Sequence, residues 1–377
     1  MTQASAAPPP DMKIQVSSRD ASTVPGLLAD WLATLLPADA APEVVLHSGV
    51  DANGMSSETL LFDATWTEDG ERELHRFVAR VAPTAADFPV FASYDLQHQY
   101  DAMRLVGELT DVPVPGVRWM EPTGTVLGSP FFLMDRIDGV VPQDVLPYTF
   151  GDNWLFDASA EQQRRVQDST TATLAALHAI PDAASTFAFL DPPYDGASLL
   201  ERHLARARGW YEFAVPDIGR SRTAERALAW LEANLPEGGD TVLCWGDARI
   251  GNVMYADFEP AAVLDWEMAA IGPRELDVSW MLFAHWVFQS ITDMLEMPGM
   301  PGFMLEEDVV AAYEEASGVP LGDLGWYHVF NALQWCVIFM RTTARSIHFG
   351  EMERPEDIET AMHHKPLMER IMNQVGA

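Results

Sequence analysis

The chain has 377 residues, of which 48% are hydrophobic, and its 56 acidic residues against 23 basic ones give a formal net charge of −33. This length and apolar content predict a globular protein with two domains or lobes and a substantial core. The negative charge argues against partners such as nucleic acid or an anionic membrane surface, because both would be repelled, and it is compatible with a cationic small molecule.

Targeting signals and disulfide bonds are not expected. The first residues, MTQASAAPPPDMKIQ, lack the basic region and apolar core of a signal peptide, and the longest apolar runs, 278–288 and 329–340, are too short to span a bilayer. Cys244 and Cys336 lie in apolar runs, which predicts buried thiols in a reducing compartment. We therefore expect a cytoplasmic protein; the sequence does not indicate its oligomeric state.

The N-terminal third changes from tail to helix to strands. Residues 1–22 are rich in Ala, Pro and Ser, which predicts a mobile tail. Apolar residues at helical spacing predict a helix over 25–36, and three apolar runs predict strands at 44–46, 59–62 and 77–81. A glycine-containing segment joins the first two strands, and such a turn can lay backbone N–H groups over phosphates, although any hairpin also favours Gly and Asn.

The middle and C-terminal parts are read mainly as helices. A helix is expected at 93–109, and residues 129–139 (SPFFLMDRIDG) predict a buried strand that runs into a polar turn. Further helices are expected at 162–180 and within 210–236, and the apolar runs 278–288 and 329–340 are expected to be buried helices. Residues 296–302 (EMPGMPG) predict a flexible loop.

The most informative stretch lies between Val242 and Glu267 and reads VLCWGDARIGNVMYADFEPAAVLDWE. It opens with a short apolar strand, which is followed by Asp247 and, five residues later, by Asn252. A turn then leads into a second apolar strand that ends at Asp265. We therefore expect these three side chains to emerge from the ends of two neighbouring strands and to be held rigidly there.

Phosphoryl transfer from a nucleotide requires such a trio. One carboxylate orients the acceptor hydroxyl and accepts its proton, while an amide oxygen and a second carboxylate hold Mg²⁺ against the phosphates, because hard cations prefer oxygen ligands. The spacing Asp-x-x-x-x-Asn followed by a strand-end Asp is the arrangement found in kinase catalytic loops. The residues therefore predict Asp247 as catalytic base and Asn252 with Asp265 as metal ligands.

This stretch resembles the signature of the aminoglycoside phosphotransferase and choline kinase family, an HGD-x-x-x-x-N loop followed by a DWE metal segment. The similar residues are Gly246, Asp247, Asn252, Asp265, Trp266 and Glu267, and the resemblance covers about residues 40–350. Arg249 and Gly251 look most like the branch of kinase domains fused to acyl-CoA dehydrogenases. Trp245 stands where the family has His; its ring is expected to keep the packing beneath the metal segment but to change the hydrogen bond to the backbone.

The resemblance implies phosphate contacts in the N-terminal part. The family's G-x-S-N segment corresponds to Gly54, Ser56 and Ser57, with Ser57 in place of the usual Asn, and Arg80 at the end of the third strand corresponds to the cation that reaches the α- and β-phosphates. Kinases pair that cation with a Glu on the following helix; here Gln99 and Asp101 both remain candidates for its position.

The resemblance also implies a hinge and supporting residues. Residues 129–139 correspond to the hinge, where the backbone of Asp135 and Ile137 would hydrogen-bond adenine and Met134 would line the pocket. Asp277, in a G-x-P-x-x-D segment, is expected to brace the catalytic loop from behind, and His178 to be a packing histidine. Four further residues are candidates for acceptor contacts or for support of the site: Arg249, Glu267, Trp280 and His285.

The resemblance predicts an α+β, protein-kinase-like bilobal fold. Its parts are a tail (1–22), an N-terminal nucleotide-binding lobe with an antiparallel sheet and a helix (23–136), and a larger, mostly helical lobe (137–377) that carries catalysis and acceptor binding. ATP and Mg²⁺ are the expected cofactors, and ATP is not distinguished from GTP.

The expected activity is transfer of the γ-phosphate to a hydroxyl of a small acceptor, as in an aminoglycoside phosphotransferase, and the negative net charge is compatible with a cationic acceptor. Two alternatives stay open. The fused-dehydrogenase branch points to a hydroxyacyl thioester or another metabolite as the acceptor. Trp245 and the missing Glu instead suit a nucleotide-binding pseudokinase that regulates a partner.

Overall fold

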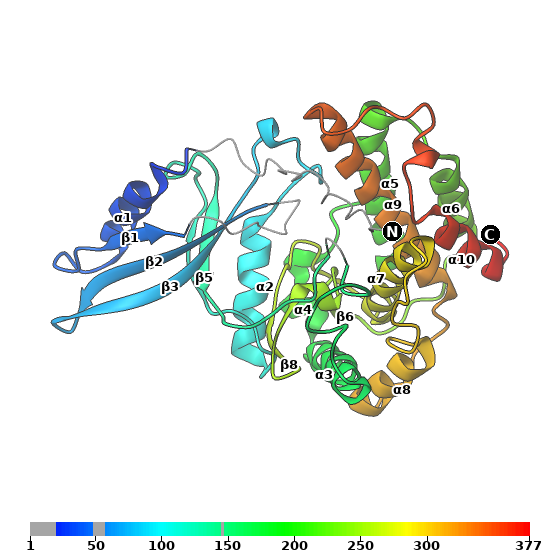
Figure 1. Ribbon diagram of the computed structural model, residues 1–377, viewed down its shortest axis with the longest axis horizontal. Coiled ribbons are helices and arrows are strands. Elements are labelled where there is room, and N and C mark those ends of the chain that lie inside the picture. Colours follow the sequence, from blue (N-terminus) through cyan, green and yellow to red (C-terminus); the bar gives the residue numbers. More distant parts are fainter. Residues whose placement is uncertain (1–19, 48–56, 145–146) are drawn as a thin grey trace, which may run out of the picture.

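The computed structural model describes residues 20–47, 57–144 and 147–377, with a sheet at the N-terminal side and most of the helices at the C-terminal side (Figure 1). Five antiparallel strands form the sheet in the order β1-β2-β3-β5-β4. Their bounds are Glu43–Leu46 (β1), Glu58–Glu68 (β2), Glu71–Val81 (β3), Val117–Glu121 (β4) and Phe131–Asp135 (β5). Of the predicted tail, residues 1–19 lie outside the described ranges.

One helix packs on each face of this sheet. Helices α1 (Val24–Leu35) and α2 (Leu96–Leu109) agree closely with the predicted helices. Side chains alternate along β3, so that Phe77 faces the cluster containing α1, whereas Val78 faces the cluster containing α2. The sheet is therefore buried on both faces along its central strands, which fixes their register.

The hairpin between β2 and β3 is longer than the sequence predicted. The expected strands covered only 59–62 and 77–81, but the two strands pair continuously from Glu58 and Val81 to Glu68 and Glu71. Asp69 and Gly70 connect them with φ angles of 50° and 86°, a tight two-residue turn that matches strand twist. The sequence missed the outer parts of these strands because residues 63–76 are mostly polar, which hides the alternation of apolar and polar side chains expected in a hairpin with one solvated face.

The C-terminal side is mainly helical, as predicted. Its helices are α3 (Ala160–His178), α4 (Ala183–Thr186), α5 (Leu199–Ile218), α6 (Arg222–Ala233), α7 (Glu275–Met294), α8 (Glu306–Ser317), α9 (Gly325–His348) and α10 (Lys365–Val375). Buried apolar residues of α5, α6, α7, α9 and α10 form one core cluster, and a second joins α3, α7 and α8 to α2. None of the helices described by the structure combines the length and apolar character needed to cross a membrane.

Two small sheets lie between these helices and correct one expectation. Strand β6 (Val242–Cys244) pairs with β9 (Ala270–Gly272), which the sequence did not reveal, and β7 (Val253–Ala256) pairs with β8 (Glu259–Val263). The strands before Asp247 and before Asp265 therefore belong to different sheets and are not hydrogen-bonded neighbours. Pairing of three-residue strands is set by tertiary contacts, which local sequence patterns do not report.

Candidate active site

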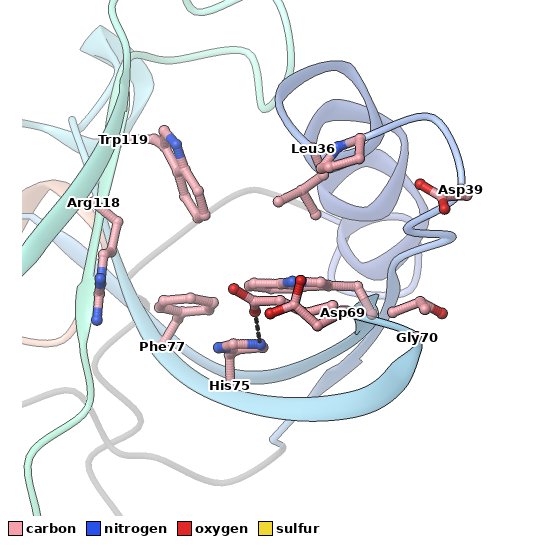
Figure 2. Close-up of a pocket in the computed structure, with 12 residues that line it drawn as sticks. Leu36, Asp39, Asp69, Gly70, His75, Phe77, Arg118 and Trp119 are labelled. Carbon is pink, nitrogen blue, oxygen red and sulfur yellow. Dashed lines mark ion pairs between the residues drawn. The ribbon is translucent and has the colours of Figure 1, made fainter.

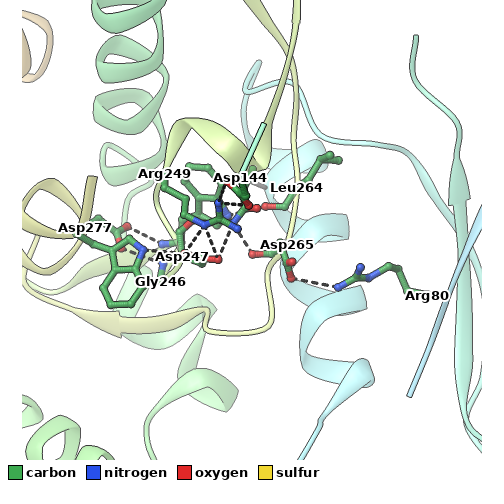
Figure 3. Close-up of polar contacts among 11 residues, drawn as sticks. Arg80, Asp144, Gly246, Asp247, Arg249, Leu264, Asp265 and Asp277 are labelled. Atoms are coloured by element: carbon green, nitrogen blue, oxygen red, sulfur yellow. Dashed lines mark hydrogen bonds and ion pairs between the residues drawn. The ribbon is translucent and has the colours of Figure 1, made fainter. Parts of the chain in front are cut away.

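The loop after β6 is held in place by Gly246 and Asp277. Gly246 has a φ of 90°, and a Cβ atom there would lie 2.1 Å from the carbonyl oxygen of Met268, so that a side chain cannot be accommodated. The Asp277 carboxylate accepts hydrogen bonds from the backbone N–H groups of Trp245 (2.6 Å) and Gly246 (2.9 Å) (Figure 3). This is the bracing contact expected from the sequence.

Asp277 is itself buried and positioned by His178 of α3. The His178 Nε2 atom lies 3.0 Å from Asp277, and its Nδ1 atom lies 2.8 Å from the hydroxyl of Tyr313. Both ring nitrogens therefore have partners, and His178 is 4% exposed, which makes it a packing histidine as predicted.

Asp247 receives hydrogen bonds from three side chains. The Asn252 amide donates to Oδ2 at 2.6 Å, the indole N–H of Trp280 donates to Oδ1 at 2.7 Å, and Arg249 Nε lies 3.1 and 3.2 Å from the two oxygens. The carboxylate is thus fixed in one orientation, which is the condition for a group that must meet a substrate hydroxyl at a defined distance. The Asn252 contact uses Nδ2, leaving its Oδ1 oxygen as the other polar atom of the amide.

Asp265 joins the N-terminal sheet to this loop. Arg80, on β3, donates from Nη2 to Oδ1 of Asp265 at 3.1 Å, although the two residues are 185 positions apart (Figure 3). Burial raises the pKa of the Asp265 carboxyl; Arg80 opposes that shift and the charge of Asp247 adds to it. Asp265 also has a φ of 58°, unusual for a residue with a side chain and typical of strained functional positions.

Trp245 anchors the segment that contains Asp265. Its indole N–H donates to the carbonyl oxygens of Leu264 (2.8 Å) and Asp265 (3.2 Å), and its ring lies 6.4 Å from that of Trp266. The side chain is 3% exposed. A large ring at this position therefore both fills the space beneath the segment and supplies a hydrogen bond to its backbone.

Arg249 bridges two carboxylates. Its Nη1 atom lies 2.7 Å from both oxygens of Asp144, while its Nε atom contacts Asp247. Burial disfavours its charged form, but the charges of Asp247 and Asp144 outweigh that effect and raise the Arg249 pKa. Asp144 had no signal in the sequence, because it lies 105 residues before Arg249 in an irregular segment.

The remaining candidates on the C-terminal side are distributed around this core. His285 is 3% exposed, and its Nδ1 lies 2.9 Å from the Tyr148 hydroxyl; burial lowers its pKa to about 4. Burial raises the pKa of Tyr94, and the negative charge of Glu267 adds to that shift. Tyr94 belongs to the segment between β3 and α2, which reaches the C-terminal helices.

That segment, residues 84–95, is fastened to α5 and α9. The guanidinium of Arg341 lies 4.5 Å from the ring centroid of Phe88 and 4.2 Å from that of Phe213, and its Nη2 donates to the carbonyl oxygen of Pro89 at 2.7 Å. Phe91 packs against Trp210 with ring centroids 4.9 Å apart. The sheet is therefore tied to the helices beside the candidate active site by a contact that sequence reasoning missed.

Among the described residues, no carboxylate of helix α2 forms an ion pair with Arg80. Gln99 is 4% exposed and lies on the buried face of α2, whereas Asp101 accepts a hydrogen bond from Gln97 and lies 3.6 Å from Arg104. Arg80 contacts Asp265 and, at 2.9 Å, the Thr59 hydroxyl. Burial distinguishes the two candidates that the sequence left open: the inward-facing one is Gln99.

The predicted phosphate and adenine contacts are placed only in part. Gly54 and Ser56 lie outside the described residues. Ser57 is 3% exposed, and its Oγ has no hydrogen-bond partner among the described residues. Met134 and Asp135 end β5 beside β3, with Ile137 two residues beyond Asp135. The Asp135 carboxylate accepts two hydrogen bonds from Arg118, at 2.8 and 3.0 Å.

The donor set suits a hard divalent cation. Within the described residues, no group of three or more His, Cys, Asp or Glu side chains has the arrangement of a metal site. The candidate ligands are instead one partly buried carboxylate, Asp265, and the amide oxygen of Asn252, beside the charge of Asp247. Two nearby carboxylates that are largely shielded from water repel each other, and a cation bound to oxygen ligands would relieve that repulsion.

Sequence comparisons relate the chain to known proteins. A family model described as "Phosphotransferase enzyme family" matches residues 57–301. "Probable acyl-CoA dehydrogenase IBR3" of Arabidopsis thaliana is 23% identical over 321 residues, which cover 80% of this chain and 35% of that protein. "Acyl-CoA dehydrogenase family member 10" of Mus musculus is 23% identical over 214 residues, which cover 56% of this chain and 18% of that protein. The chain thus spans about a third or less of these relatives.

Solved structures share the fold. A protein from Ralstonia eutropha JMP134, described as a candidate aminoglycoside phosphotransferase, has a TM-score of 0.63 at 19% identity, with 92% of this chain and 96% of that chain covered. Macrolide 2′-phosphotransferase MphH of Brachybacterium faecium has a TM-score of 0.51 at 16% identity, with 92% and 97% covered. A thermostable mutant of aminoglycoside phosphotransferase APH(4)-Ia, in ternary complex with ADP and hygromycin B, has a TM-score of 0.52 at 15% identity, with 92% and 98% covered. These matches confirm the predicted α+β, protein-kinase-like fold.

Proposed function

Because the chain belongs to the phosphotransferase enzyme family, we propose that it transfers the γ-phosphate of ATP to a hydroxyl group of a small molecule. The supporting observation is that Asp247 and Asn252, in the loop after β6, interact with each other and with Asp265, which follows β8. Asn252 donates to Asp247, and the charge of Asp247 acts on the partly buried Asp265, which accepts a hydrogen bond from Arg80. Such a cluster combines a fixed carboxylate with oxygen ligands and a phosphate-binding cation.

In the proposed mechanism, Asp247 orients the acceptor hydroxyl and takes its proton as the oxygen attacks the γ-phosphorus, and ADP leaves. Asn252 and Asp265 would hold Mg²⁺, which when bound supplies positive charge to the phosphate oxygens. Arg80 would serve the α- and β-phosphates from β3. The bonds from Trp280, Asn252 and Arg249 keep Asp247 in the orientation that this proton transfer needs.

The nucleotide would lie between the sheet and the helical side. We propose residues 23–136 as the nucleotide-binding lobe, with adenine against the backbone of Asp135 and Ile137 and beside Met134, and residues 137–377 as the catalytic and acceptor-binding lobe. ATP is further supported by the ADP in the APH(4)-Ia complex, a protein of the same fold. Gly54, Ser56 and Ser57 remain proposed phosphate contacts, and a cytoplasmic location remains part of the proposal.

Two acceptor classes have specific support. The APH(4)-Ia complex contains hygromycin B, which supports an aminoglycoside. The two curated relatives carry acyl-CoA dehydrogenase names, and the chain matches only a part of each, which supports a hydroxyacyl thioester made or used beside a dehydrogenase domain. Overexpression with an aminoglycoside panel separates the two: unchanged drug tolerance favours the thioester.

The activity is tested by following ADP release and product phosphorylation with ATP, Mg²⁺ and both acceptor classes. Asp247→Asn keeps the size of the side chain but removes the base, and should lower kcat by at least about 100-fold. Asp257→Asn, in the exposed turn between β7 and β8, is the matched control and should leave kcat unchanged. Full activity in Asp247→Asn would remove Asp247 from its role.

The same assay tests the pseudokinase alternative. ATP binding by the wild-type chain without transfer to any acceptor would favour a regulatory protein. The two hydrogen bonds from the Trp245 indole to the backbone at Leu264 and Asp265 argue for the enzyme, because they hold the segment that carries the proposed metal ligand Asp265. A Trp245→His variant that gained transfer activity absent from the wild type would reverse that argument.

A further inference from the structure

A pocket of about 630 Å³ opens on the face of the five-stranded sheet that carries α1 (Figure 2). It lies beyond the C-terminal end of α1, at Leu36 and Pro37, and is bounded by the β2–β3 hairpin and by β4. Its volume falls in the usual range of small-molecule sites, about 300 to 1,000 Å³. Because α2 covers the opposite face of the sheet, this pocket is separate from the cluster around Asp247.

The pocket walls are aromatic. Trp66 stacks on His75, with ring centroids 3.6 Å apart and the planes 5° apart, and lies parallel to Phe77 at 6.0 Å. Trp119 meets Trp66 and Phe77 at a steep angle, with centroids 6.3 and 6.1 Å away. Trp66 and Phe77 are almost fully buried in this arrangement, whereas Trp119 and His75 are only partly buried and so present ring surface to the pocket. Electron-rich aromatic faces attract cations.

Three acidic residues line the pocket. Asp39, Glu68 and Asp69 all line it, and Asp69 is held in the tight turn of the hairpin. Glu68 lies 3.5 Å from His75 Nε2, while Asp39 and Asp69 are exposed and form no ion pair among the described residues. Arg118 also lines the pocket, but its positive charge is balanced by the carboxylate of Asp135, to which it donates two hydrogen bonds.

We propose that this pocket binds an organic ammonium ion with an apolar body, held against Trp119 by cation–π attraction and by the carboxylates of Asp39 and Asp69. Aromatic rings with nearby carboxylates favour a weakly hydrated cation over an anion or a neutral molecule, because the ring quadrupole and the acids act in the same direction. The ligand class follows from this pocket and does not depend on the reaction proposed for Asp247.

The probe is phenyltrimethylammonium, titrated into the whole chain and followed by saturation-transfer NMR. Its neutral isostere, tert-butylbenzene, controls for simple burial of apolar surface. The double variant Asp39→Asn/Asp69→Asn changes two exposed residues and should fold normally; Asp30→Asn, an exposed acid on α1, is the matched control. Trp119→Ala tests the aromatic wall, with thermal unfolding as a check on folding. If the probe instead binds at the candidate active site, its binding should change in Asp247→Asn or when ATP is added.

Saturable binding should weaken about tenfold or more in Trp119→Ala and in the double Asp variant, and should be unaffected by Asp30→Asn, Asp247→Asn or ATP. The isostere should bind at least about tenfold more weakly. Absence of saturable binding up to about 10 mM probe would overturn the proposal. Equal binding of the neutral isostere would also overturn it, because the pocket would then bind apolar molecules without preference for charge. Unchanged binding of the probe to the folded double Asp variant would overturn it as well.

Discussion

The indole N–H of Trp280, on α7, donates a hydrogen bond to Oδ1 of Asp247 at 2.7 Å. Trp280 is 1% exposed, and its ring lies 5.7 Å from that of Trp335 of α9, so its position is fixed by the helical core. The sequence placed Trp280 near an acceptor pocket or in support of the site, and the hydrogen bond shows the support. Through it, packing of two distant helices sets the orientation of the proposed base.

Trp280→Phe removes this donor while keeping most of the ring volume. A hydrogen bond to a charged group contributes about 1.5–3 kcal/mol, so kcat should fall roughly 10- to 100-fold while KM for ATP stays nearly constant. Trp326→Phe is the matched control, because Trp326 is also buried and its indole donates instead to the Leu231 carbonyl oxygen. Steady-state kinetics on both variants decide the matter; equal losses of kcat would mean that general destabilisation explains the effect.

Asp277→Ala should destabilise the fold as well as the loop. The substitution leaves the buried N–H of Trp245, the partly buried N–H of Gly246 and the ring of His178 without their acceptor, and each unsatisfied buried group costs about 1–3 kcal/mol. We expect a loss of about 3 kcal/mol or more in the free energy of unfolding, measured by urea denaturation. Asp293→Asn, an exposed acid on the same helix, should change stability by less than about 0.5 kcal/mol. A loss below about 1 kcal/mol for Asp277→Ala would contradict the bracing role.

Arg341→Lys should loosen the segment 84–95. Lysine keeps the charge but loses the planar group that stacks on Phe88 and Phe213 and donates to Pro89. Amide hydrogen exchange in the segment should become at least about fivefold faster, while exchange in β2 and β3 is unchanged.

Arg220→Lys is the control for that experiment, since Arg220 is exposed in the loop after α5 and its guanidinium lies 5.4 Å from the ring centroid of Tyr211. It should leave the segment unaltered. Unchanged exchange in Arg341→Lys would show that Phe91 and Trp210 hold the segment without Arg341.

Acid should destabilise the protein through His203. Burial lowers the His203 pKa to about 3, and Arg206 contributes in the same direction. The ordinary pKa is 6.5, so the unfolded chain binds a proton that the folded chain excludes; stability is fully present above about pH 6.5 and falls as the pH drops towards 3. One such residue contributes a slope of up to about 1.4 kcal/mol per pH unit.

His203→Gln tests this slope, because glutamine can still donate to the Ile271 carbonyl oxygen, which lies 2.8 Å from His203 Nε2, but does not titrate. The free energy of unfolding, measured between pH 7 and 4, should fall less steeply with pH in the variant. The difference in slope should be up to about 1.4 kcal/mol per pH unit, the contribution of one proton. Identical slopes for variant and wild type would show that His203 does not carry the effect. The contact matters for the site because Ile271 lies in β9, the partner of β6.

The sequence by itself determined those features that depend on residues close together in the chain. Helical periodicity placed α1, α2 and α3 to within a few residues, and the spacing of Asp247 and Asn252 marked the loop, because a short loop has few ways to arrange neighbouring polar groups.

Only the tertiary structure decided which distant elements meet. The pairing of β6 with β9, the contact of Arg80 with Asp265 and the bridge from Arg249 to Asp144 join residues that are far apart in sequence. The aromatic pocket likewise exists because α1 ends before it covers the whole face of the sheet. Such contacts depend on how whole elements pack, and packing is settled by the burial of many side chains together, which no single stretch of sequence records.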